Sequence, residues 1–138
     1  MLPVIISAAA AIIVAALTVF LTKSKERETA WRDKKLEYYE EFILAANNIV
    51  GSASDQDKIG FAKAVNKLNL VASNGVLSAL HEFCDEIAES NTDSSKDKHD
   101  RLWSILVWEI RDDLDDSPTK NRSDFIAKLW ASGAGSNS

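Results

Sequence analysis

The first twenty-two residues, Met1 to Thr22, carry no charged side chain. As an α-helix the run from Leu2 to Leu21 would be about 30 Å long, at roughly 1.5 Å per residue, which matches the hydrocarbon thickness of a bilayer. A cleaved secretory signal is the alternative, but the run is long for one and its basic residues follow it instead of preceding it. The sequence therefore predicts an uncleaved signal-anchor, residues 1–22, that crosses a membrane once as a transmembrane helix.

The charges that follow this run predict its orientation. Residues 23–35 have a net charge of about +3, and Lys23, Lys25 and Arg27 come first. Basic residues favour the cytoplasmic side and anionic lipid headgroups, so we expect these three at the lipid surface, the N-terminus outside and the C-terminal domain cytoplasmic. Because the rest of the chain is acidic, with a total of −5, nucleic acid is not an expected partner.

The remaining residues are enough for one domain, which we place at residues 23–131. The single cysteine, Cys84, cannot form an internal disulfide and fits a reducing cytoplasm. Apolar residues recur every three to four positions, which predicts helices throughout. The first such stripe, between Trp31 and Val50, lies in a stretch without Gly or Pro, so we expect the anchor to continue directly into this helix.

Capping and breaking residues divide the rest of the domain. Ser54 and Asp57 resemble a capping pair that starts a second helix, and Ser73-Asn74-Gly75 separates it from a third. A polar loop at residues 90–98 leads to a fourth helix at about 97–115, and Ser123 starts a short fifth helix after Pro118. We expect an all-α fold: the transmembrane helix continues into an antiparallel four-helix bundle with this short fifth helix, followed by a disordered tail at residues 132–138.

Two surfaces are candidates for protein contacts. The fourth helix is apolar nearly all round its middle, where only Ser104 and Glu109 are polar, so Trp103 and Trp108 are candidates for a partner surface. In the first helix, small residues fall along one side and would permit close helix contact. The candidates there are Ser7, Ala11 and Ala15, followed by Thr18.

A metal site is the alternative from a different class. His81 and Cys84 lie one helical turn apart, and residues 112–116 hold four aspartates in five positions. Zinc needs more ligands than this pair supplies, and the acidic run lacks the turn-forming glycine of a calcium loop. The competing interpretation is that Cys84 packs in the core and that the acidic run is a solvated helix end.

The chain contains no phosphate-binding loop, H-E-x-x-H or G-x-S-x-G motif, so we expect no enzyme, no cofactor and no small-molecule substrate. The segments Trp31–Phe42, Asn69–Leu77 and Trp108–Leu114 resemble those of uncharacterised small bacterial membrane-anchored proteins with a cytoplasmic helical domain. The resemblance implies a bacterial inner-membrane location and brings no activity.

The predicted function is a single-pass, membrane-anchored interaction or scaffolding protein. Its expected partners are membrane lipid and either another protein or a second copy of the chain. A membrane-tethered metal-binding sensor or enzyme that uses His81, Cys84 and the 112–116 run is one alternative, and a component of a stress or phage response is another.

Overall fold

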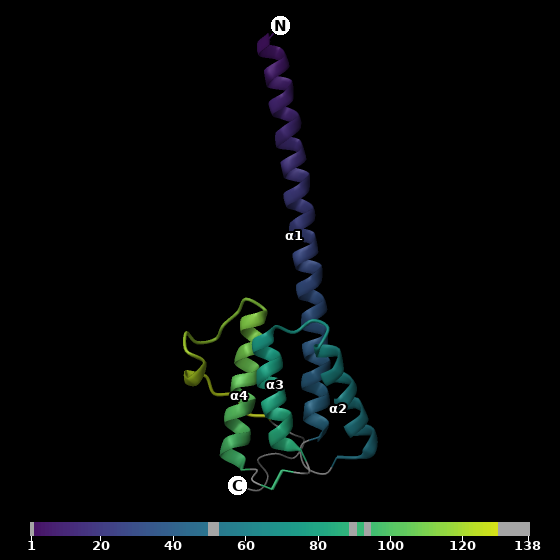
Figure 1. The fold of residues 1–138 in the computed structure, drawn as a ribbon, viewed down its shortest axis with the longest axis vertical. Helices are drawn as coiled ribbons and strands as arrows, with labels where there is room; N and C mark the ends of the chain where they lie inside the picture. The colour runs from purple at the N-terminus through teal and green to yellow at the C-terminus, as the bar shows by residue number, and fades with distance from the viewer. Residues whose placement is uncertain (1, 50–52, 89–90, 93–94, 130–138) are drawn as a thin grey trace. The chain divides into compact units, whose positions relative to one another are not determined.

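All the regular structure in the residues that the structure, a computed structural model, describes is helical. These are residues 2–49, 53–88, 91–92 and 95–129, with side chains described from residue 10 onward. The elements are α1 (Leu2–Ile49), α2 (Asp55–Leu68), α3 (Asn74–Ile87), α4 (Lys96–Asp113) and the 3₁₀ helix η1 (Arg122–Asp124), as Figure 1 shows. The chain divides into two compact units, Met1–Lys34 and Lys35–Ser138, and α1 contributes residues to both.

The predicted transmembrane helix requires correction. Across the described residues, no helix is both long and apolar enough to cross a membrane. The uncharged part of α1 with described side chains runs from Ala10 to Thr22, before the charges that begin at Lys23. At roughly 1.5 Å per residue it is about 20 Å long, against about 30 Å of bilayer hydrocarbon. Residues 1–9 of the predicted anchor lie outside the described side chains.

This finding overturns every prediction that depended on the membrane helix. The fold class with an N-terminal transmembrane helix, the single-pass signal-anchor and the bacterial inner-membrane location are therefore wrong. The all-helical part of the prediction is confirmed for the described residues.

In the second unit the C-terminal part of α1 packs with α2, α3 and α4 around one core, and consecutive helices run antiparallel (Figure 1). Phe42, Phe83 and Trp103 meet at its centre, with the Trp103 ring 6.2 Å from Phe42 and 5.2 Å from Phe83 between centroids. Every helix contributes fully buried or nearly buried apolar side chains to this core. The remaining buried members are Tyr39, Ala46, Ala64, Leu68, Val71, Val76, Ala79, Leu80, Leu102, Leu106 and Ile110.

Serine caps start the three shorter helices. Ser54 accepts the N–H of Asp57, whose carboxylate accepts the Ser54 N–H in return, so the predicted capping pair is confirmed as a capping box. Ser73 and Ser95 cap α3 and α4 through the N–H groups of Val76 and Lys98. Each cap satisfies a backbone donor that the first helical turn leaves without a partner.

The end of α4 is a Schellman motif. The N–H of Asp116 bonds to the carbonyl of Arg111 at 2.9 Å, and the N–H of Asp115 bonds to that of Asp112 at 3.0 Å. Asp115 has φ of 60°, the left-handed conformation that glycine usually supplies at this position. Pro118 follows, so α4 cannot continue in its original direction.

The predicted short fifth helix is wrong. Ser123 lies within the single turn of η1, and residues 125–129 have no regular structure. The physical reason is tertiary: the Ser104 hydroxyl bonds both the N–H and the carbonyl of Ala127, which a helix would need for its own ladder. Trp130 and the predicted tail at 132–138 lie outside the described residues.

Candidate functional site

Exposed apolar side chains are the main feature of the first unit. Between Ile12 and Leu21, seven large apolar side chains are 54–70% exposed. They are Ile12, Ile13, Val14, Leu17, Val19, Phe20 and Leu21. Single exposed apolar residues are common on proteins, but a continuous set on one helix is a candidate contact surface.

One side of this helix carries small residues. At about 100° per residue, Ala11, Ala15 and Thr18 fall on one face, while Leu17 lies about 160° from Ala15 around the helix. Thr18 Oγ1 donates to the carbonyl of Val14 at 2.9 Å, so its hydroxyl is satisfied within the helix. The side chains on this face are therefore short. The face can be buried without leaving the Thr18 hydroxyl proton without an acceptor.

Most of the other residues of α1 that were predicted to make contacts are exposed. Ser7 lies outside the described side chains, so the structure places only Ala11 and Ala15 of the predicted contact set, and both are exposed. Lys23, Lys25 and Arg27 are exposed on the following turns. Their predicted lipid contact depended on the membrane helix that the described residues do not support.

The two tryptophans predicted for a partner surface occupy other places. Trp103 is 3% exposed and belongs to the aromatic centre of the core. Trp108 is half-buried, and its Nε1 donates to the carbonyl of Thr119 at 3.0 Å. The apolar side chains around α4 therefore make contacts within the chain. One side of the helix faces the core, and another side faces the residues that follow the helix.

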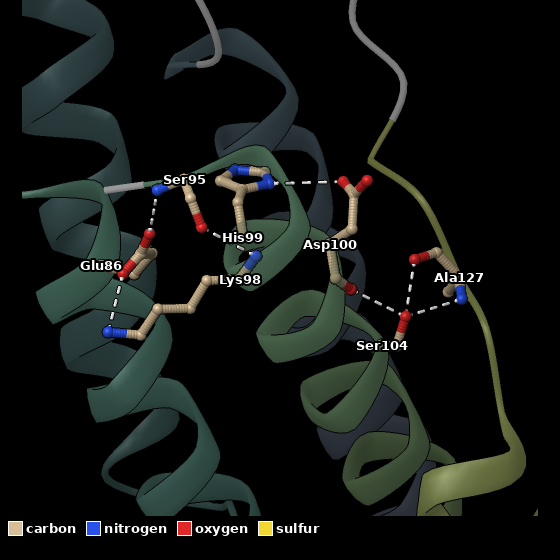
Figure 2. Close-up of polar contacts among 7 residues, drawn as sticks. All are labelled: Glu86, Ser95, Lys98, His99, Asp100, Ser104 and Ala127. Carbon is tan, nitrogen blue, oxygen red and sulfur yellow. Dashed lines mark hydrogen bonds and ion pairs between the residues drawn. The ribbon is translucent and has the colours of Figure 1, made fainter. Parts of the chain in front are cut away.

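Residues 117–129, here named the C-terminal strap, run beside α4 after the Schellman turn (Figure 1). Ser104 is buried, and its Oγ accepts the N–H of Ala127 at 2.9 Å. The same hydroxyl lies 2.8 Å from the carbonyls of Ala127 and Asp100, either of which can accept its single proton (Figure 2). In the middle of the strap, Arg122 pairs with Glu109 at 2.7 Å.

A buried carboxylate holds the connection between α3 and α4. Glu86 is 3% exposed, and its carboxylate accepts the N–H of Ser95 at 3.0 Å and pairs with Lys98 Nζ at 3.3 Å (Figure 2). Asn91 donates to the same carboxylate at 3.3 Å and to the Glu86 carbonyl at 2.9 Å. The bond from Ser95, with help from Lys98, holds the pKa of Glu86 below its ordinary value. Glu86 is thus an ionised structural anchor beside the positive end of α4.

The shallow hollow beside this anchor offers little chemistry. His99 lines it together with Glu86, Ser95 and Lys96. The imidazole packs edge-on to Phe83, with ring centroids 5.3 Å apart, and its Nδ1 lies 3.7 Å from an Asp100 oxygen. Because the Glu86 carboxylate is already bonded to three donors, it is poorly suited to act as a general base.

The residues of the metal alternative lie in different environments. His81 is exposed, whereas Cys84 is half-buried, and burial raises the pKa of its thiol to about 11. In the acidic run, Asp113 accepts hydrogen bonds from Lys35 and Tyr39 of α1. Within the described part of the chain, no three His, Cys, Asp or Glu side chains are grouped so that they could hold a metal ion.

One member of the acidic run, Asp113, is not a solvated residue at a helix end. Lys35 reaches Asp113 at 3.0 Å with both side chains largely buried, so this carboxylate ties α1 to the end of α4. Burial, reinforced by the bond to Asp113, raises the pKa of Tyr39 well above its usual value, so the phenol remains a donor. Asp116 pairs with Arg111 at 2.9 Å.

The sequence contains a signal for two functional residues that the sequence analysis did not predict, Glu86 and Ser104. Glu86 falls in register with the buried positions Ala79 and Phe83, so a charged side chain occurs where the helix faces the core. Ser104 is similarly a polar residue within the apolar middle of α4. A buried polar group requires partners, and those partners lie in segments that the local pattern does not specify.

Comparison with known proteins identifies no relative: no family model matches the chain, and neither the curated proteins nor the solved structures yield a match. The resemblance to small bacterial helical proteins therefore stays a prediction.

Proposed function

We propose that the chain is a noncatalytic helical interaction protein, in which the apolar part of α1, residues 10–22, packs against the same segment of a second copy. The observation that carries this proposal is the exposure of all seven large apolar side chains between Ile12 and Leu21. Covering such a surface removes apolar area from water and favours association.

Two features support a second copy as the occupant. The face that carries Ala11, Ala15 and Thr18 lets two helix backbones approach closely, as small residues do at tight helix pairs. A second copy also supplies the same narrow face and the same apolar flanks, so an isologous contact needs no further complementarity. The charged residues that begin at Lys23 limit the contact to the uncharged segment.

Cysteine cross-linking tests this contact directly. In a Cys84→Ser background, Ala15→Cys puts one thiol on the small-residue face, and Leu17→Cys, about 160° away from residue 15 around the helix, is the matched control. We expect mild oxidation to give a disulfide-linked dimer with Ala15→Cys and much less with Leu17→Cys. Residue 15 lies near the middle of residues 10–22, so it meets its counterpart in either a parallel or an antiparallel pair.

Three outcomes would contradict the proposal: equal cross-linking of both variants, no cross-linking of either, or recovery of the chain as monomers bound to lipid vesicles. A second variant checks the geometry without a disulfide. Ala11→Leu puts a large side chain on the small-residue face and keeps the two helices apart. Light scattering should therefore show a weaker dimer than for the unmodified chain.

A further inference from the structure

The contacts between α4 and the C-terminal strap are directed mainly at backbone atoms. Ser104 bonds the N–H and carbonyl of Ala127, and Trp108 donates to the carbonyl of Thr119. Two contacts join side chains: Ser117 Oγ donates to Asp112 Oδ1 at 2.7 Å, and Arg122 pairs with Glu109. The α4 side chains therefore bind backbone groups of an extended segment, and the Arg122–Glu109 ion pair sets the register.

The strap has little regular structure of its own, although Ala127 and Leu129 pack against the core. It follows the last helix of the unit, and residues 117–129 contain only the three-residue turn η1. The residues that join it to α4 include Asp115, whose left-handed φ of 60° is unfavourable for a residue with a Cβ atom. Straightening this hinge would relieve the strain, and strained hinges next to a terminal segment favour exchange between copies.

We infer that the strap is exchangeable: the α4 face that carries Ser104, Trp108 and Glu109 binds residues 119–129 of a second copy in place of its own. The exchanged pair makes the same hydrogen bonds and the same Arg122–Glu109 pair as the single chain. Exchange then depends on concentration, because the chain's own strap competes at an effective concentration of about millimolar. The inference does not depend on pairing through α1.

Two singly substituted chains test the exchange. In a Cys84→Ser background, one chain carries Glu109→Cys and the other carries Arg122→Cys, so each has one thiol on one side of the 2.7 Å contact. After the two chains are mixed at high concentration and gently oxidised, we expect a heterodimeric disulfide that increases with concentration. Ile126→Cys in place of Arg122→Cys is the matched control, because Ile126 is 77% exposed on the same strap.

A third chain with both Glu109→Cys and Arg122→Cys reports the contact within one molecule. An internal disulfide in this chain, without any heterodimer in the mixture, would overturn the inference, as would failure of both disulfides. Equal heterodimer formation with Ile126→Cys would also overturn it, since that result reports proximity of two copies through another contact. The Ala15→Cys experiment uses a different pair of thiols, so either proposal can fail alone.

Discussion

The two parts of α1 differ in whether an aromatic side chain on the helix is exposed or buried. Phe20, in the first unit, is 68% exposed, whereas Phe42, in the second, is fully buried between Phe61 and Trp103. Residues 10–22 are apolar on every side, while residues 35–49 carry an apolar stripe with charged residues between its members. A stripe can be buried by three neighbouring helices, but a helix that is apolar all round cannot be covered by one small unit.

The largest expected effect compares these two phenylalanines by substitution. Phe42→Ala removes a ring from the core and should lower the free energy of unfolding of the second unit by about 3–5 kcal/mol. Phe20→Ala should change it by less than about 0.5 kcal/mol, as is usual for exposed sites. Urea unfolding followed by tryptophan fluorescence measures both. A comparable loss for Phe20→Ala would show that residue 20 is part of the folded unit's core.

Thiol reactivity tests the same difference in exposure. Burial raises the pKa of Cys84 to about 11 from 9.0, so its thiolate fraction near neutral pH is about 100-fold lower than that of an ordinary cysteine. Iodoacetamide should therefore modify Cys84 about 100-fold more slowly than the thiol of a Phe20→Cys, Cys84→Ser chain. Equal rates, measured by mass spectrometry on folded protein, would show either that Cys84 is open to solvent or that residue 20 is covered.

The third comparison contrasts a carboxylate that anchors a loop with an exposed one. Because the pKa of Glu86 is lowered in the folded chain, this residue stabilises the protein above its ordinary pKa of 4.5, and the contribution is lost as pH falls through the lower, folded value. Glu86→Gln should lower stability at pH 7, by less than Phe42→Ala does, and should flatten the loss of stability as pH falls below 4.5. Glu28→Gln, at an exposed position of the first unit, is the control. An unchanged acid profile for Glu86→Gln would rule out the anchoring role.

The smallest expected effect concerns glycine in the folded unit. A Cβ atom at Gly60, an exposed position inside α2, would meet no atom within 4 Å, so Gly60→Ala should raise the free energy of unfolding by about 0.5–1 kcal/mol. Gly75→Ala is the matched control, because its Cβ would displace the Glu109 carboxylate that pairs with Arg122. Thermal unfolding compares them, and an equal gain for both would show that the Glu109–Arg122 pair adds little stability.

Local signals allowed much of the second unit to be predicted. The Ser54–Asp57 capping box was found as expected, and the fourth helix, predicted at about 97–115, begins and ends within two residues of its place at Lys96–Asp113. These features depend on groups a few residues apart: a hydroxyl and an N–H at a cap, or apolar side chains on one face. The continuous helix from the first unit into the second was also correctly predicted, because no helix-breaking residue separates them.

The errors arose where distant residues compete with a local preference. Residues 125–129 have a helical pattern, but Ser104, 23 positions before Ala127, takes the backbone groups that a helix would use. Asp113 lies in a run that suggests a solvated helix end, yet Lys35 and Tyr39 bond to it from more than 70 positions away. Likewise, the wide apolar surface of α4 suggested an external partner, but the strap of the same chain covers part of this surface.

The sequence by itself determined where α2, α3 and α4 begin, which of their faces are apolar and that the first helix runs unbroken into the unit from Lys35 onward. Those properties follow from the backbone and from side chains within one or two turns. Only the tertiary structure decided that Trp103 belongs to the core, that Glu86 anchors a loop and that residues 117–129 form a strap. Each of these depends on buried polar or aromatic groups finding partners elsewhere in the chain, which the three-to-four-residue period does not encode.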